Sequence, residues 1–339
     1  SQMYDSQTDS RLTAWAAMLG ATLMIAHHVA GKATRDALFL TQFEVTSLPK
    51  MMIVAALLSV AAVLGMSRFM SRLGPARLVP GIYAASGVGF LLEWLLMGFR
   101  PELIAIILYL HITVLGAIVI SGFWSVINER FDPYTAKRTI ARLAGFATLG
   151  GLLGGLGAKV VADMADTQAI LLMLGAIHLI CGLALGYVAR GQRQGTAKAR
   201  EAKFLFTPLK TNPLIRNMAL LVLLVATTAA LLDYLLKSTA SATLPKEELI
   251  HFFSYFYMAV GLGGFLLQTL VGDKALSRLG LGGAMAAWPL VVLCGGMVAF
   301  LVKHLLTVTL LRAGANLLYN SFFRAGFEVL YTPIDAVDK

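Results

Sequence analysis

Long apolar stretches separated by short polar ones follow one another along the whole chain. Each stretch is about 18 to 25 residues long, and a helix of that length crosses the roughly 30 Å hydrocarbon core of a bilayer. The stretches are uniformly apolar and do not alternate between two faces, as the strands of a barrel would, so the backbone must pair within helices. The pattern predicts an all-α polytopic membrane protein.

Ten helices are expected from these stretches. The predicted ranges are 12–30, 48–66, 78–98, 103–127, 139–162, 168–188, 214–237, 249–271, 283–302 and 304–326. Composition supports this class, because 58% of the 339 residues are apolar, 14% are charged and the mean hydropathy is +0.76. An ordinary soluble globular domain is therefore excluded.

A short repeat divides the chain into two halves. Ser71-Arg72-Leu73-Gly74 recurs as Ser277-Arg278-Leu279-Gly280, each time after the second predicted helix of its half. Two similar bundles are typical of transporters. We therefore predict an amino-terminal six-helix bundle at 1–188, a cytoplasmic basic linker at 189–213 and a carboxyl-terminal bundle at 214–339. The second bundle has four predicted helices, so we expect two more beyond residue 339.

The net charge of +10 is distributed according to topology. Lysines and arginines gather in alternate loops, for example Arg68, Arg72 and Arg77 in one, and many more in the 189–213 linker. Loops rich in these residues are cytoplasmic in membrane proteins. The pattern predicts a cytoplasmic amino terminus, with the lipid bilayer and not nucleic acid as the partner.

A cluster of charge, Lys32-Ala33-Thr34-Arg35-Asp36, lies where the first membrane-spanning segment should still be crossing or just leaving the bilayer. A charged side chain in hydrocarbon costs about 3 kcal/mol or more, so such residues usually face a polar cavity and bind a ligand. Two cations beside one acid favour an anion such as phosphate, with Asp36 orienting Arg35. The alternative is that Lys32 and Arg35 extend to the lipid headgroups.

Two further polar groups lie in the second half. Asp233 and Lys237 are four residues apart on the seventh predicted helix, where they can form a site or simply an intrahelical ion pair. Arg312, Asn316 and Tyr319 share one face of the tenth predicted helix, and they either line a cavity or form interhelical hydrogen bonds. The candidate substrate-binding residues are Lys32, Arg35, Asp36, Asp233, Lys237, Arg312, Asn316 and Tyr319.

Other sequence features predict a structural role and not a binding or catalytic site. Closely spaced glycines on the fifth predicted helix are typical of close helix packing; they are Gly150, Gly151, Gly154, Gly155 and Gly157. Glu93 lies beside Trp94, which indicates a position at the membrane interface. We find no nucleophile with a base, no metal-binding cluster and no sign of a cofactor, so we do not expect an enzyme.

The charge cluster and several later motifs resemble the ATP/ADP nucleotide translocase family. The matching residues, in chain order, are Lys32, Thr34, Arg35, Asp36 and Leu38; Val119-Ile120-Ser121 with Phe123-Trp124, Asn128 and Ala136-Lys137-Arg138; Asp233 with Lys237; and Glu328 with Tyr331 and Pro333. The Arg72 and Arg278 turns also resemble the basic turn of the major facilitator superfamily. These resemblances imply a major-facilitator-like carrier in which cations of helices one and seven hold nucleotide phosphates in a central cavity.

The resemblance implies exchange of ATP and ADP by alternating access, in the inner membrane of a bacterium. Where family members carry an acid in helix four, this chain has His111-Ile112-Thr113. Two alternatives stay open. One is a carrier of another organic anion, and the other is a non-transporting sensor or anchor joined to a regulatory domain, as in some bacterial relatives.

Overall fold

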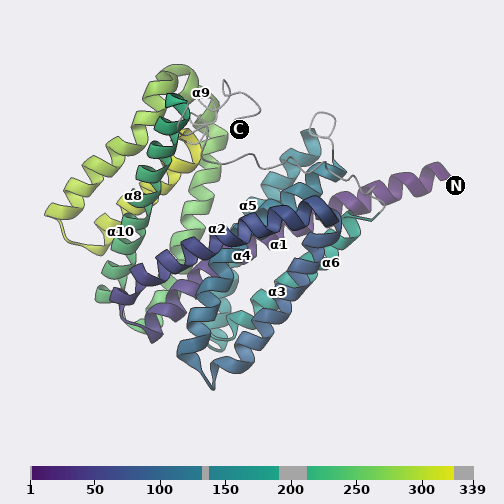
Figure 1. The fold of residues 1–339 in the computed structure, drawn as a ribbon, viewed down its shortest axis with the longest axis horizontal. Helices are drawn as coiled ribbons and strands as arrows, with labels where there is room; N and C mark the ends of the chain where they lie inside the picture. Colours follow the sequence, from purple (N-terminus) through teal and green to yellow (C-terminus); the bar gives the residue numbers. More distant parts are fainter. Residues whose placement is uncertain (1, 132–136, 191–211, 324–339) are drawn as a thin grey trace. The chain divides into compact units, whose positions relative to one another are not determined.

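The computed structural model of the chain describes residues 2–131, 137–190 and 212–323. Within these ranges every regular element is helical (Figure 1). The elements are α1 (Gln2–Gln42), α2 (Leu48–Leu73), α3 (Pro75–Met97), α4 (Pro101–Arg130), α5 (Lys137–Met164), α6 (Ile170–Val188), α8 (Pro213–Thr243), α9 (Leu249–Leu301) and α10 (Leu305–Leu318), with short 3₁₀ turns at Val45–Ser47 and Lys246–Glu248 and a π-helical turn at Tyr319–Phe323.

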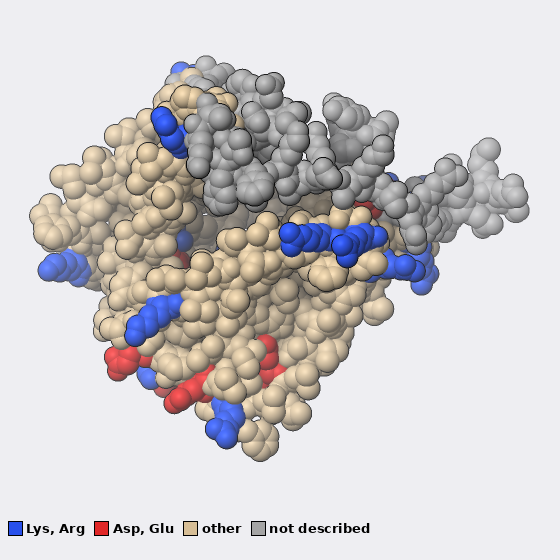
Figure 2. Space-filling model, viewed as in Figure 1, with Lys and Arg blue, Asp and Glu red and all other residues tan. Residues whose placement is uncertain are grey.

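The described residues contain the ten predicted helices, because α9 consists of two helices joined at Gly280. Nine spans in the described part of the chain are long and apolar enough to cross a membrane. Large apolar side chains are also exposed on the helices, for example Leu57 at 68%, Leu183 at 76% and Phe300 at 76%. Figure 2 shows few charged side chains on the visible surface. Such a surface is suited to lipid, and the protein is an integral membrane protein.

Two compact units make up the described structure. The amino-terminal unit contains α1 to α6 and residues 246–258, and the carboxyl-terminal unit contains α8 and the described residues from 259 to 323. The predicted boundaries at 1–188, 189–213 and 214–339 stay a prediction. Most of the predicted linker, and the motif at Glu328, lie outside the described residues.

The first helix is longer than predicted. It does not end at residue 30 but continues to Gln42, so Lys32, Arg35 and Asp36 lie inside a span of Arg11–Gln42. The reason is that apolar positions continue between the charges: a buried run follows Asp36, consisting of Ala37, Leu38, Phe39 and Leu40. The charged side chains themselves have partners, described below, which lower the cost of placing them in a helix that crosses the membrane.

Glycines on α5 allow that helix to approach α1 closely. A Cβ atom at Gly150 would lie 2.0 Å from the carbonyl oxygen of Thr22, and one at Gly154 would lie 2.2 Å from that of Ala26. Backbone atoms cannot move aside as the end of a flexible side chain can. The predicted packing role of these glycines is therefore confirmed.

The two tetrapeptides of the repeat end in the same backbone conformation. Gly74, between α2 and α3, has φ 74° and ψ 148°, and Gly280, at the junction within α9, has φ 65° and ψ 177°. These two glycines are the residues with positive φ in the described part of the chain. Because this region of φ favours glycine, the turn geometry that the two glycines share supports the internal repeat that the sequence predicts.

Candidate functional site

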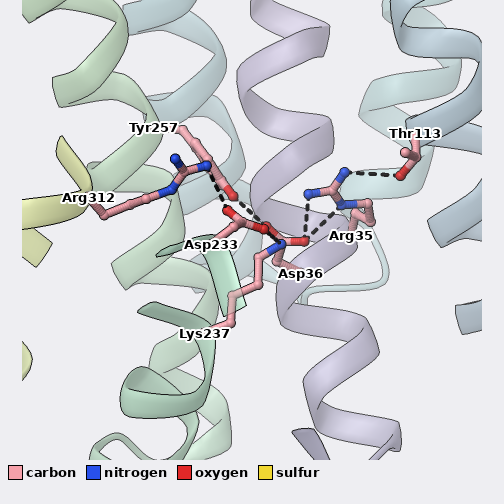
Figure 3. A network of polar contacts seen from close by, with 7 residues as sticks. All are labelled: Arg35, Asp36, Thr113, Asp233, Lys237, Tyr257 and Arg312. Carbon is pink, nitrogen blue, oxygen red and sulfur yellow. Dashed lines mark hydrogen bonds and ion pairs between the residues drawn. The ribbon is translucent and has the colours of Figure 1, made fainter. Parts of the chain in front are cut away.

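The charge cluster of α1 is buried in the amino-terminal unit, with Arg35 at its centre (Figure 3). Its Nε and Nη2 atoms each lie 2.8 Å from Oδ1 of Asp36, and its Nη1 donates a hydrogen bond to Thr113 of α4 at 3.0 Å. Arg35 is 9% exposed and Asp36 is 1% exposed. Arg35 is therefore buried against α4, and the alternative that this residue extends to the headgroups is wrong.

Aromatic side chains surround this cluster. The hydroxyl of Tyr257 donates to Oδ2 of Asp36 at 2.5 Å, and the Lys32 Nζ lies 5.7 Å from the centroid of the Tyr257 ring. The guanidinium carbon of Arg35 lies 4.8 Å from the centroid of the Tyr109 ring. Both tyrosine rings thus offer their electron-rich faces to a cation. The group of Lys32, Arg35 and Asp36 carries two positive charges and one negative charge.

Arg35 retains capacity to bind an anion. A guanidinium has five N–H groups, and three of them are directed at Asp36 and Thr113. The other two N–H groups have no acceptor among the described residues, so they are available to a ligand. Because Asp36 fixes the plane of the guanidinium, these two donors have a set direction, as the sequence analysis expects of an orienting acid.

A second charge cluster lies in the carboxyl-terminal unit, where the carboxylate of Asp233 on α8 forms ion pairs with two cations (Figure 3). Lys237 Nζ lies 2.6 Å from its Oδ2, and Arg312 Nη2 of α10 lies 3.2 Å from its Oδ1. The Lys237 side chain is fully buried, while the buried Nε of Arg312 has no hydrogen-bond partner. The expected intrahelical pair is therefore present, and α10 adds a further cation to it.

The other two candidates follow Arg312 in the sequence, Asn316 on α10 and Tyr319 at the start of the π-helical turn. Tyr319 is 40% exposed, and its ring lies 6.4 Å from that of Trp288 and 5.7 Å from that of Phe323. The carbonyl of Asn316 accepts a hydrogen bond from the side chain of Asn320 at 3.0 Å. The structure thus brings together Arg312 with Asp233, and it places Tyr319 in an aromatic cluster.

Several residues of these clusters are not among the sequence candidates. Tyr109, Thr113 and Tyr257 resemble many polar residues of membrane helices, and no spacing rule links them to residue 35 or 36. Glu93 carries a stronger signal, a carboxyl within an apolar stretch. Glu93 is 5% exposed and pairs with His111 of α4, whose Nδ1 lies 2.7 Å from its Oε1. The expected position of Glu93 at the membrane interface stays a prediction.

No protein-family profile and no curated protein matches the chain. Among solved structures, it is similar to a bacterial homologue of the human lysosomal transporter Spinster, crystallised in an inward-facing and unoccupied conformation. The TM-score is 0.61, the identity is 14%, and the match covers 97% of this chain and 76% of the other. The chain therefore shares the fold of that structure. A place in the ATP/ADP translocase family stays a prediction.

Proposed function

We propose that the protein is a membrane transporter that carries nucleotides, in exchange of the ATP/ADP type, by alternating access. The observation that supports this most is the charge of the two clusters. Each has two cations and one carboxylate. The first cluster, and Asp233 with Lys237 of the second, lie in helices that are long and apolar enough to cross a membrane. The transporter fold supplies the second line of support.

An excess of positive charge away from water calls for an anionic ligand. Phosphate suits these residues, because arginine binds it through paired N–H groups and lysine acts as a compact point charge. We infer that Lys32 and Arg35 contact phosphate in the amino-terminal unit and that Lys237 and Arg312 are the corresponding cations of the carboxyl-terminal unit. Asn316 and Tyr319 contact base or sugar, since a half-exposed ring beside Trp288 is suited to stacking.

Ligand-dependent thermal stability tests this proposal, because a ligand specific to the folded state raises the melting temperature by mass action. The purified full chain is heated with ATP, ADP, AMP, cyclic AMP or simple organic phosphates. Lys32→Gln removes a half-buried cation, and Arg35→Gln combined with Asp36→Asn removes an ion pair without leaving one charge alone. Lys303→Gln is the control, because Lys303 is exposed.

We expect a stabilising shift with nucleotides that is lost in Lys32→Gln and in the double variant and is kept in Lys303→Gln. No shift with any of these compounds, in a well-folded sample, would contradict the nucleotide proposal. A shift with a different organic anion would favour the first alternative. Nucleotide binding without flux in liposomes would favour a sensor.

The proposal includes an orientation, with the amino terminus and the Arg72 turn on the cytoplasmic side of a bacterial inner membrane. Replacing Ser71 by Cys in a variant lacking Cys181 and Cys294 provides a reporter at that turn. We expect a membrane-impermeant thiol reagent to label it only in inside-out vesicles. Labelling in intact cells would reverse the orientation.

A further inference from the structure

A line of polar side chains outside both charge clusters joins four helices of the amino-terminal unit. Glu93 Oε1 of α3 lies 2.7 Å from His111 Nδ1 of α4, and His111 Nε2 lies 2.8 Å from Ser86 Oγ of α3. Ser86 Oγ in turn lies 2.8 Å from His178 Nδ1 of α6. The His178 ring then faces that of His27 on α1, with centroids 3.8 Å apart. We call these five residues the histidine chain.

The histidine chain is buried, and both of its ends carry polar atoms without partners. Glu93, Ser86, His178 and His27 are each at most 5% exposed, and the His111 side chain is 10% exposed. Glu93 Oε2 at one end, and His178 Nε2 and His27 Nε2 at the other, are buried without a hydrogen-bond partner. A buried polar atom without a hydrogen bond lowers the stability of the fold. A ligand that forms hydrogen bonds with these atoms would therefore be bound favourably.

Few other ionisable groups face the histidine chain from the helices around it. His28 of α1 lies near His27, and Lys32 and Arg35 lie near His28. Tyr83 of α3 and Cys181 of α6 interact with each other, and the Tyr83 ring lies 5.1 Å from that of His178. Phe90 stacks on His111 with centroids 4.2 Å apart. Glu93 is thus the carboxyl group paired with this chain.

The ligand that fits the side chains of the histidine chain is a proton. No group of three His, Cys, Asp or Glu residues in the described ranges is placed to hold a metal ion. Imidazole and hydroxyl groups can each accept a proton at one atom and give one up at another. From Glu93 to Ser86 the chain follows seven residues of α3, about 10 Å along the helix axis, or about a third of the hydrocarbon core.

We propose that Glu93 and His111 bind a proton that is coupled to transport, and that Ser86 relays it to His178, whose ring lies beside that of His27. This inference rests on the proposed transport function and names its coupling ion. Intramembrane chains of carboxyl and imidazole groups have this role in pumps and transporters.

The relay step balances with one proton. The O–H bond of protonated Glu93 breaks as an N–H bond forms at His111 Nδ1. His111 Nε2 gives its own proton to the Ser86 hydroxyl, and the hydroxyl's original proton forms an N–H bond at His178 Nδ1. One proton has then left Glu93 and one is held at His178, beside His27, with no change in electrons.

Infrared difference spectra of the purified full chain between acidic and alkaline buffer test the proton site without any substrate. We expect a band of a buried carboxylic acid that is lost in Glu93→Gln and kept in Glu102→Gln, since Glu102 is an exposed carboxyl on the same helix as His111. The same band in Glu93→Gln as in the wild type would overturn the proposal.

Ser86→Ala provides the second variant, because it removes one hydroxyl and keeps the fold. We expect the imidazole bands that change with pH to lose the contribution of His178 in Ser86→Ala, and to stay complete in Ser125→Ala. Ser125 is half-buried on α4, where its hydroxyl donates a hydrogen bond to the Ser121 carbonyl of the preceding helical turn. Complete imidazole changes in Ser86→Ala would contradict the relay.

Nucleotide uptake into liposomes under an imposed pH gradient tests the coupling. We expect the gradient to accelerate uptake of labelled ATP or ADP by the wild type and by Ser125→Ala, and the acceleration to be lost in Ser86→Ala while exchange without a gradient continues. Acceleration retained in Ser86→Ala would overturn the coupling. Failure of nucleotide uptake in the wild type would count against the proposed function alone, and the infrared comparison would then decide the proton site.

Discussion

Lys237 and Asp233 form an ion pair of 2.6 Å inside α8, and the lysine side chain is fully buried. Because Arg312 also contacts this carboxylate, Asp233 compensates two cations at once. Removing one partner of a buried pair leaves an uncompensated charge, which is more costly than removing the pair.

We therefore predict that Asp233→Asn lowers the free energy of unfolding by about 3 kcal/mol or more. Combining it with Lys237→Met should recover part of this loss, because one of the two uncompensated cations disappears while Arg312 remains. Unfolding in mixed micelles, followed by circular dichroism, measures both variants. Equal stability of Asp233→Asn and the wild type would show that the carboxylate does not compensate these cations.

Tyr257 stabilises Asp36 through the hydrogen bond to its Oδ2. Tyr257→Phe removes the donor and leaves a buried carboxylate oxygen less well satisfied, so we expect a loss of about 1 to 3 kcal/mol in unfolding free energy. Tyr255→Phe is the matched control, since Tyr255 is 46% exposed and only two residues away. A loss of the same size in both variants would assign the effect to the helix and not to Asp36.

The glycines of α5 give a prediction with an internal control. Gly150→Ala and Gly154→Ala place a Cβ atom against the backbone of α1, so we expect each to cost about 3 kcal/mol or more and to separate the two helices. Gly145→Ala lies on the same helix with no atom within 4 Å, and alanine favours helix there. Thermal unfolding measures the stability of the three variants. A Gly150→Ala protein as stable as Gly145→Ala would contradict the close contact between α5 and α1.

Gly74 and Gly280 should respond alike to substitution. Alanine is strained at positive φ, and we expect Gly74→Ala and Gly280→Ala each to lower stability by about 1 to 2 kcal/mol. Neither glycine has an atom within 4 Å of an added Cβ, so steric contact adds nothing to that cost. Similar losses, measured by chemical unfolding, would confirm the turn geometry, whereas unchanged melting temperatures would show that the turns tolerate side chains.

The fold could be predicted from the sequence largely because apolar length fixes membrane helices. The number of helices, the packing glycines and the repeated turn all depend on local pattern, and the structure confirms them. The end of α1 could not be predicted in this way, because Lys32, Arg35 and Asp36 interrupt the apolar run. Their helical state depends on partners such as Thr113 and Tyr257, which are distant in sequence.

The candidate site could be predicted only in part, for the same reason. Charge in apolar surroundings identifies Arg35 and Lys237, and the spacing of Asp233 and Lys237 predicts their pair. The contact of Arg312 with Asp233, and the histidine chain from Glu93 to His27, join residues of different helices. Such contacts follow from tertiary packing, which periodicity does not contain.

Exchange of labelled ATP or ADP by the purified protein in liposomes is the most direct test of the central claim, that its buried cations serve nucleotide transport. We predict saturable uptake that requires nucleotide inside the liposomes, is lost in Lys32→Gln and in the Arg35→Gln, Asp36→Asn double variant, and persists in Lys303→Gln. Uptake no greater than that of protein-free liposomes, from a folded wild-type protein, would contradict it.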